Sequence, residues 1–450
     1  MRPESTRTVG GPAANVGPPT GAVRASTEPW AGAREREFPL RDAEKQARRE
    51  IAHLGWRPIL HEFRAAGPSA AHCQLRGADS TPIPQGLGSG KGCAAPARVG
   101  ALFEALEHAF TGPRILTTLP VELRDLADLA AGPLRAERAM GRLDGTGRPR
   151  LACLPYDALD GGGPIDVPLF LWAPWYPLPT GPMAAHRARL GDTADYRAVL
   201  SFSVNTGCAI GATRDEALLH ALNEWAERDA LSVFLLRTVH DGGPLPARLS
   251  PSALPPFLRQ RLAQASAAVQ GPVTLLDLTT DIDVPVVLAH APPLPGGAPR
   301  YGVGASLSGE NAVERAVSEL VQDHLIAQWA REPQGADARA RLAAHPRLLA
   351  CAQMAVDGRI DDAPWGPLPA DAVAPAATVA EQRAEAVRRI SAAGHRVVAR
   401  DLAVLAHGTA VVQVQCPGLE RFHLITDGHL ALPGPRGRRL RAQPPRSAHR

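Results

Sequence analysis

The stretch NTGCAIGATRDEALLHALNEWAERDA, residues 205–230, decides the fold. A glycine-punctuated run leads into a segment in which Ala217 and Ala221 are four residues apart and Glu224 and Glu227 are three apart. Residues four apart share one face of a helix, so the alanines would let the helix approach a neighbour closely. The two glutamates stand about 60° apart around the helix and can address one point in space. The stretch therefore predicts an extended run that turns through glycine into a helix with two acids on one face.

The same register occurs three times along the chain. In each copy two alanines stand four residues apart, a glutamate follows three residues later, and Glu or Gln comes three residues after that. The copies are Ala97, Ala101, Glu104 and Glu107; Ala217, Ala221, Glu224 and Glu227; and Ala312, Ala316, Glu319 and Gln322. Each follows a glycine-rich segment: GLGSGKG from Gly86, NTGCAIGAT from Asn205 and YGVGASLSG from Tyr301. The copies are too widely spaced for a solenoid, so we expect three separate units of this kind.

Convergence of the three helices would turn up to six carboxylates toward one cavity. Beyond the register, Glu216 lies eleven residues before Glu227 and within about 20° of it around the helix, and Arg315 lies on the stripe of Glu319. Unpaired carboxylates resist ionising together. Mg²⁺ would resolve this repulsion, because it takes one or two carboxylates together with substrate phosphates. Since Arg228 and Arg315 match phosphate oxygens, the pattern predicts a site for phosphoryl transfer.

Two other interpretations of these segments are weaker. Glutamates on amphipathic helices are usually solvated, but three copies in matched register behind glycine turns are not expected of a solvated face. GLGSGKG is also not a Walker A loop, which requires Gly at the position of Gln85 and Ser or Thr at the position of Gly92.

Composition limits the class of protein. Of the 450 residues 45% are hydrophobic, which is enough for a large core, and no run of eighteen apolar residues could span a membrane. The N-terminus lacks the apolar region of a secretion signal, so we expect a cytoplasmic protein. The six scattered cysteines have no zinc or disulfide spacing. The net charge of +4 stems from arginines between Arg436 and Arg450, so the body offers no basic surface for nucleic acid.

The chain is expected to have three segments and an α+β fold. Residues 1–40 predict a disordered lead-in, residues 41–435 a single domain, and residues 436–450 a basic disordered tail. A helix is predicted from Asp42 to Gly55. Strands are predicted at RPILHEF, at VTLLDL from Val273, at VPVVLAH from Val284, and at the pair HRVVARDLAV and GTAVVQVQCPG. Helices and strands are interspersed without a regular βαβ period, which favours α+β over a doubly wound fold.

At these residues the chain resembles the YcaO family of ATP-dependent amide-activating enzymes. The resemblance rests on GSGKG and ARVGALFEALEH, on NTGCAIGATRDEALLHALNEWAERDA, and on GVGASLSGENAVERAVSELVQ. DLTTDIDVPVV from Asp277 and VQCPGLERF from Val414 are similar to strand segments of the family, and the resemblance covers residues 45–435. It implies a YcaO-type fold in which mixed sheets and helices converge on a central site for ATP and Mg²⁺.

The resemblance also implies an activity and a set of site residues. Members phosphorylate a peptide backbone amide oxygen together with, or after, attack by a nucleophile, and the product is an azoline, a thioamide or an amidine. The implied metal ligands are Glu104, Glu107, Glu216, Glu224, Glu227 and Glu319. The implied nucleotide-binding residues are Lys91, Glu104, Glu107, Arg228, Arg315 and Gln322. The implied catalytic residues are Glu227, Arg228 and Arg315.

Three residues depart from the pattern of the family. Gly100 stands where Ser is usual, His108 where Arg is usual, and Ala212 where Asn is frequent. These departures keep open a second interpretation, a catalytically degenerate scaffold that binds peptide or presents it to a partner enzyme. A third, a metal-dependent hydrolase that needs no ATP, also stays open.

The resemblance implies a ribosomally synthesised precursor peptide as the substrate. The chain ends in LPGPRGRRLRAQPPRSAHR and lacks the PxPxP ending of azoline-forming members, which gives weight to a non-azoline product. It has no room for the fused E1-like module of some members, so we expect a separate leader-binding or sulfur-delivery partner protein. A homodimer stays open, and neither nucleic acid nor membrane is expected as a partner.

Overall fold

Three β-sheets organise the residues that the computed structural model describes, which are 35–294, 297–330 and 340–442. The first sheet is antiparallel, in the order β1 (Arg57–Phe63), β2 (Ser69–Arg76), β3 (Pro82–Gly92). The second has the order β11 (Arg300–Ala305), β10 (Val286–Ala291), β9 (Thr274–Asp277), β8 (Arg248–Leu249), β12 (Trp365–Gly366). The third has the order β4 (Glu122–Asp125), β5 (Arg150–Ala158), β13 (Val398–Val404), β14 (Ala410–Gln415), β7 (Cys208–Gly211), with β6 (Ile165–Pro168) paired to β5. With the helices between them, these sheets confirm the α+β fold.

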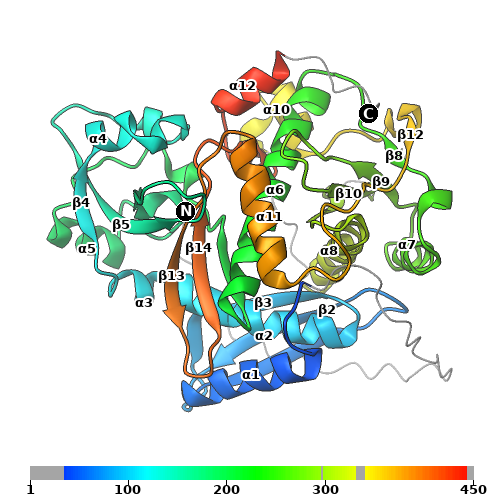
Figure 1. The fold of residues 1–450 in the computed structure, drawn as a ribbon, viewed down its shortest axis with the longest axis horizontal. Coiled ribbons are helices and arrows are strands. Elements are labelled where there is room, and N and C mark those ends of the chain that lie inside the picture. The colour runs from blue at the N-terminus through cyan, green and yellow to red at the C-terminus, as the bar shows by residue number, and fades with distance from the viewer. Residues whose placement is uncertain (1–34, 295–296, 331–339, 443–450) are drawn as a thin grey trace. The chain divides into compact units, whose positions relative to one another are not determined.

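Each sheet ends at one of the glycine-rich strands β3, β7 and β11, and each of these edge strands leads into one of the three predicted helices. These helices are α2 (Ala94–Thr111), α6 (Arg214–Phe234) and α8 (Gly309–Ala330). Every one packs on the strand of its own unit and also on the strand of another unit: α2 contacts β7, α6 contacts β11 and α8 contacts β3. Figure 1 shows α2 beside β3 of its own unit. The units therefore form a closed ring of contacts that brings the three helices together.

Close contact between strand and helix backbones explains the spacing of small residues in each unit. A Cβ atom on Gly302 of β11 would lie 2.3 Å from the carbonyl oxygen of Ala316, and one on Gly90 of β3 would lie 1.8 Å from that of Ala97. Both distances are far below van der Waals contact, so only glycine fits at these two strand positions. The prediction that the alanine pairs allow a close approach is confirmed, and the neighbour is the strand of the same unit.

The remaining helices pack around these units. Each of the three long helices α2, α8 and α6 has one further helix packed against it: α1 (Leu40–His53) packs against α2, α7 (Pro256–Ala268) against α8 and α11 (Val379–Ala392) against α6. The shorter helices are α3 (Pro113–Leu116), α4 (Leu126–Ala131), α5 (Pro182–Leu190), α10 (Pro346–Ala352) and α12 (Pro435–Arg441). The largest apolar cluster surrounds α6, and two smaller clusters lie beside α8 and α2. Each unit helix thus buries one side in a core, which fixes the direction of its opposite side.

Most local predictions from the sequence are confirmed. The helix predicted from Asp42 to Gly55 is α1, and the predicted strands are β1, β9, β10, β13 and β14. No helix in the described ranges is long and apolar enough to cross a bilayer. Residues 1–34 of the predicted disordered lead-in lie outside the described residues. The prediction is wrong for residues 35–40, because Glu35 accepts a hydrogen bond from Arg315 and α1 begins at Leu40.

The disordered tail predicted from residue 436 is wrong for residues 436–441, which belong to α12. Arg436 is 2% exposed and donates hydrogen bonds of 2.7 and 2.8 Å to the carboxylate of Asp229 on α6. The carboxylate of Glu420 accepts two backbone N–H groups of the same segment, at 2.9 and 2.7 Å. Composition could not reveal the contact with Asp229, which lies 207 residues before Arg436 in the sequence. The rest of the predicted tail, residues 443–450, lies outside the described residues.

We predict that Gly302→Ala destabilises the protein by about 1–3 kcal/mol, because the added methyl group overpacks the contact between β11 and α8. The Cβ atom would also lie 2.4 Å from the backbone nitrogen of Leu320, so neither backbone can give way alone. Gly358→Ala is the matched control, since its Cβ atom would meet nothing within 4 Å. Urea denaturation followed by circular dichroism measures both variants, and equal midpoints for the two would contradict the close packing.

Candidate functional site

Acidic side chains from α2, α6 and α8 meet where the three units join. Burial raises the pKa of Glu107 well above its ordinary value of 4.5, and the carboxylates of Glu104 and Glu224 raise it further. Desolvation raises the pKa of Glu227 to about 8, and Glu319 on α8 adds to the rise. Repulsion therefore acts between carboxylates on different helices. The structure brings these five glutamates together in the way that the repeated register predicts.

One glutamate of each unit is held by the glycine-rich strand of the same unit. In every case a carboxylate oxygen accepts a hydrogen bond from a backbone N–H group of that strand or of the turn before it. The pairs are Ser89 with Glu104 at 2.9 Å, Gly207 with Glu224 at 2.8 Å, and Val303 with Glu319 at 3.4 Å. The repeated glycines thus have two roles, because they admit the helix and they expose the N–H groups that orient its first acid.

Two cations lie among these carboxylates. Lys91 of β3 forms an ion pair with Glu319 of α8, and Arg228 forms one with Glu224, with 2.6 Å between Nη2 and Oε1. The side chains of Lys91 and Arg228 are 31% and 26% exposed, so solvent reaches both. An anionic ligand can therefore compete with the glutamates for these two cations.

Asp323 is a further member of this group that the sequence analysis missed. It lies one turn after Glu319 on α8, on the same face of the helix. Desolvation and the charge of Glu319 raise its pKa to about 7, although the residue keeps contact with solvent. The signal was present in the sequence as a spacing of four residues, but the register considered only the residue three positions after the first glutamate.

Glu216 does not join the other carboxylates. Its two oxygens accept backbone N–H groups, from Glu37 at 2.6 Å and from Ala212 at 3.2 Å. The helical wheel correctly places Glu216 on the stripe of Glu227, but eleven residues advance about 16 Å along a helix. Glu216 and Glu227 therefore lie on the same face of α6 but about 16 Å apart along it. The expectation that both residues bind one metal ion is corrected.

Arg315 and Gln322 lie on α8 on either side of Glu319. Nη2 of Arg315 donates to the carboxylate of Glu35 at 2.5 Å, so that the guanidinium is already paired with an anion of the chain. Gln322, which takes the place of the second glutamate in the third unit, is 9% exposed. The structure thus places both residues on the helix that also carries Glu319 and Asp323.

The donor set suits Mg²⁺ only in company with phosphates. Within residues 35–294, 297–330 and 340–442, no three His, Cys, Asp or Glu side chains are grouped closely enough to hold a metal ion by themselves. Mg²⁺ does not require such a cage, because it is usually bound by one or two carboxylates together with phosphate oxygens and water. Desolvation and the charge of Glu319 raise the pKa of both Glu227 and Asp323, and a divalent cation would favour their charged forms.

The three departures from the family pattern have local explanations. A Cβ atom on Gly100 would lie 3.3 Å from Cα of Gly90, so glycine at this position assists the packing of α2 on β3. Nδ1 of His108 lies 2.7 Å from the carbonyl oxygen of Leu87, and its Nε2 lies 3.8 Å from Glu104. Ala212 contributes its backbone N–H to Glu216. None of the three positions breaks the arrangement of the carboxylates.

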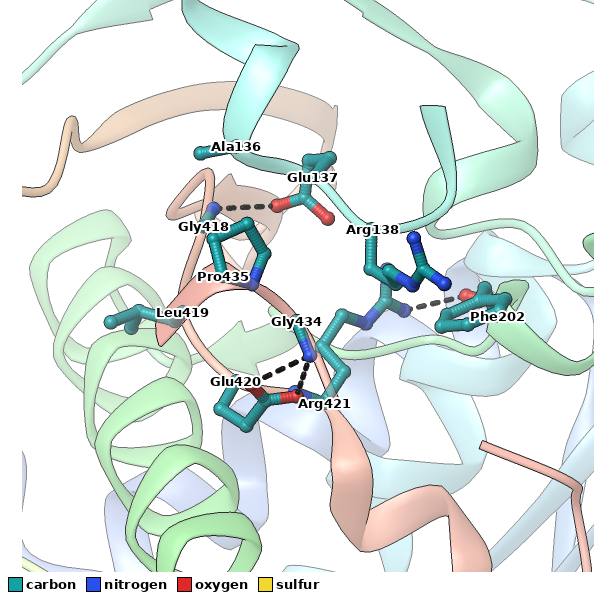
Figure 2. Close-up of a pocket in the computed structure, with 10 residues that line it drawn as sticks. All are labelled: Ala136, Glu137, Arg138, Phe202, Gly418, Leu419, Glu420, Arg421, Gly434 and Pro435. Atoms are coloured by element: carbon teal, nitrogen blue, oxygen red, sulfur yellow. Dashed lines mark hydrogen bonds between the residues drawn. The ribbon is translucent and has the colours of Figure 1, made fainter. Parts of the chain in front are cut away.

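A small enclosed cavity lies apart from this group, beside the C-terminal segment (Figure 2). Its volume of about 10 Å³ is enough for about one water molecule. Arg421 lines it and donates through Nη2 to the carbonyl oxygens of Leu171 and Phe202 at 3.1 and 2.7 Å. Its Nε and Nη1 have no partner among the described residues, so we expect a water molecule to bind them there. The lining includes none of the predicted site residues, and the cavity is therefore a structural feature.

Comparisons with known proteins concern the family and the fold of the chain. The family model described as YcaO cyclodehydratase, ATP- and Mg²⁺-binding, matches residues 89–420. An uncharacterized protein of Methanothermobacter thermautotrophicus is 38% identical over 125 residues, which cover 27% of this chain and 31% of that protein. YcaO from Methanopyrus kandleri, solved with AMPPCP and Mg²⁺, has a TM-score of 0.59 at 21% identity and covers 86% of this chain and 93% of that chain. A heterocyclase solved with substrate and cofactor has a TM-score of 0.62 at 18% identity, over 86% of this chain and 54% of that chain. At these identities the two structures support the fold.

We predict that the ligand-free protein loses stability as the pH rises from about 4.5 to about 8, by about 1–3 kcal/mol. The folded pKa of Glu227 lies at about 8, above its ordinary 4.5, so the folded state keeps a proton in this window that the unfolded chain releases. Glu227→Gln removes this titration and should give a smaller slope, while Asp323 and Glu107 keep part of it. Urea denaturation at several pH values measures the slope, and an unchanged slope in the variant would contradict the raised pKa.

Proposed function

The chain belongs to the YcaO family, and on this premise we propose that it is an enzyme that uses ATP and Mg²⁺ to phosphorylate a backbone amide of a ribosomally synthesised peptide. The observation that carries the proposal is the group of carboxylates from three helices, in which desolvation and mutual repulsion raise the pKa of Glu107, Glu227 and Asp323. The relatives solved with AMPPCP and Mg²⁺, and with substrate and cofactor, support the same proposal.

In this proposal Glu104, Glu224 and Glu319 are the principal metal ligands. Each is oriented by a backbone N–H group on one oxygen. The other oxygen pairs with Arg228 in Glu224 and with Lys91 in Glu319, and would bind Mg²⁺ if phosphate took over these cations. Glu107 and Glu227, three residues after the first two, complete the set. Glu216 is too far along α6 to bind the same metal ion as these glutamates. It is proposed instead to bind the ligand at the end of the site where Arg315 lies.

Lys91, Arg228 and Arg315 are the proposed phosphate ligands. In the free protein each pairs with a carboxylate of the chain, namely Glu319, Glu224 and Glu35 respectively. Phosphate oxygens can take the place of these carboxylates, since Arg and Lys bind both anions in the same way. Mg²⁺, when bound, would neutralise phosphate oxygens and so assist phosphoryl transfer.

Glu227 is the proposed general base. A carboxyl group must be charged to accept a proton. Desolvation raises the pKa of Glu227 to about 8, and Lys91 and Arg228 beside it favour the charged form that this role requires. The proton it takes is that of the attacking nucleophile. Arg228, one residue further along α6, is placed to balance the charge that the transferred phosphoryl group carries.

The proposed reaction determines where each atom goes. The nucleophile bonds to the amide carbon, and the former carbonyl oxygen bonds to the γ-phosphorus as ADP leaves. The carbon–oxygen bond then breaks, so that the amide oxygen departs in inorganic phosphate. A side-chain hydroxyl or thiol gives an azoline, sulfide gives a thioamide and an amine gives an amidine, so the nucleophile decides the product.

A separate partner protein is proposed to bring the peptide or the sulfur donor to this site. The described residues of the chain are occupied by the three sheets and their helices. Co-purification of the chain with proteins encoded beside its gene tests this proposal, and turnover of the precursor peptide by the isolated chain at full rate would contradict it.

A scaffold without catalytic activity is the second candidate function. The observation that favours it is that Lys91, Arg228 and Arg315 each already pair with a carboxylate. Calorimetric titration with ATP in the presence of Mg²⁺ separates the two candidates, because a scaffold should give no heat of nucleotide binding.

We predict that Glu227→Gln and Glu319→Gln each lower ATP turnover by about 10²–10³, because each removes a preorganised charge from the reacting centre. Turnover is measured as release of ADP and phosphate in the presence of the precursor peptide encoded beside the gene. Glu314→Gln is the matched control on α8, since Glu314 pairs with Arg261 of α7 at 3.3 Å. Full turnover in the Glu227 variant would count decisively against the proposed site.

We also predict that oxygen-18 placed in the peptide amide appears in the released phosphate, because the amide oxygen leaves with phosphorus. Mass spectrometry of the phosphate measures this transfer. A metal-dependent hydrolase would instead cleave the peptide without ATP, and label that stays in the peptide while ADP accumulates would contradict amide phosphorylation.

A further inference from the structure

The chain places one of its own carboxylates on Arg315. Glu35 belongs to a short segment, residues 35–39, that precedes α1 and that we call the strap. Its Oε2 accepts a hydrogen bond from Arg315 at 2.5 Å, and its Oε1 accepts from Oγ of Ser306 at 2.6 Å and from Nδ2 of Asn223 at 3.3 Å. Donors from α6, from α8 and from the turn after β11 thus surround a single anion.

A second contact ties the strap to α6. The backbone N–H of Glu37 donates to Oε1 of Glu216 at 2.6 Å. Glu216 is itself fixed by the N–H of Ala212 on its other oxygen. Apart from its junction with α1, where the carbonyl oxygen of Pro39 accepts the N–H groups of Asp42 and Ala43, the strap is held at these two points, and both of them are polar.

Apolar packing contributes little to the strap. The side chain of Glu35 is only 9% exposed, but residues 36–39 are exposed, including Phe38 at 43%. A segment held mainly by charge and hydrogen bonds can be released when another anion takes over its partners, because little hydrophobic surface has to be uncovered. We therefore expect the strap to leave the site when a ligand replaces its polar contacts.

The fit of Glu35 to its surroundings is incomplete. Oδ1 of Asn223 and Nδ1 of His220 are buried and have no hydrogen-bond partner within the described parts of the chain. Buried polar atoms without partners are costly, so they indicate an occupant richer in polar groups than a single carboxylate. A nucleotide, with several phosphate oxygens and ribose hydroxyl groups, has that chemistry.

We propose that Glu35 is an internal competitor of the nucleotide, which holds Arg315 in the free protein and must leave before phosphate can bind there. The proposal rests on the proposed function, because that function makes Arg315 a phosphate ligand. The strap would keep the site closed to nucleotide until a ligand with enough affinity opens it, which lowers the apparent affinity by the fraction of molecules that are open.

The test compares Glu35→Gln with the wild-type chain by calorimetric titration of Mg²⁺–AMPPNP. Loss of the charge should tighten nucleotide binding by about tenfold, as expected if about one molecule in ten is open in the wild type. Glu37→Gln is the matched control, because the carboxylate of Glu37 makes no hydrogen bond or ion pair within the described residues and its N–H is retained. Equal or weaker binding by the Glu35 variant would overturn the proposal and would leave the proposed function standing.

Hydrogen exchange of the Glu37 amide gives an independent measure in the wild-type chain. This amide is held by Glu216 in the free protein, so release of the strap by Mg²⁺–AMPPNP should speed its exchange. Slower exchange in the complex would mean that the strap becomes part of the bound site, and would overturn the proposal.

Failure of the proposed function is distinguished by a second titration, with inorganic tripolyphosphate. If AMPPNP binds to none of the variants, the nucleotide-dependent function is wrong. Tighter binding of tripolyphosphate to the Glu35 variant than to the wild type would still support Glu35 as the competitor at an anion site, whereas equal binding or none would overturn it as well.

Discussion

The contact between a glycine strand and an alanine face, made three times, is the constraint on which the rest of the structure depends. At Gly302 and Gly90 the strand lies so close to the helix that no side chain fits between the backbones. This approach places backbone N–H groups within reach of Glu104, Glu224 and Glu319. Because each helix also packs on the strand of another unit, the ring of contacts turns three separate acidic faces toward one site.

The free protein compensates for this concentration of negative charge with its own groups. Lys91 and Arg228 each pair with a glutamate, and desolvation raises the pKa of Glu227 to about 8. Both ion pairs can be exchanged, since a cation that pairs with a carboxylate can also pair with phosphate. The same logic applies to Arg315 and Glu35 at the other end of the site.

The sequence predicted the part of this account that is encoded locally. Spacing within a helix predicted α2, α6, α8 and the faces of their acids, because one pattern controls both the backbone approach and the side-chain direction. The spacing misplaced Glu216, because a helical wheel gives the angle of a residue around the helix and not its position along the axis. The spacing pattern also missed Asp323, which lies one turn after Glu319. Glu35 and Arg436 could not be predicted, because their partners Arg315 and Asp229 lie more than two hundred residues away.

The central claim is that the three helices hold one metal-bound triphosphate between them. A crystal structure of the chain with Mg²⁺ and AMPPNP tests it most directly. The account predicts phosphate oxygens on Lys91 and Arg228, and Mg²⁺ on the glutamates that the strand N–H groups orient. A complex in which Glu224 and Glu319 keep their ion pairs with Arg228 and Lys91, with the nucleotide bound elsewhere, would contradict it.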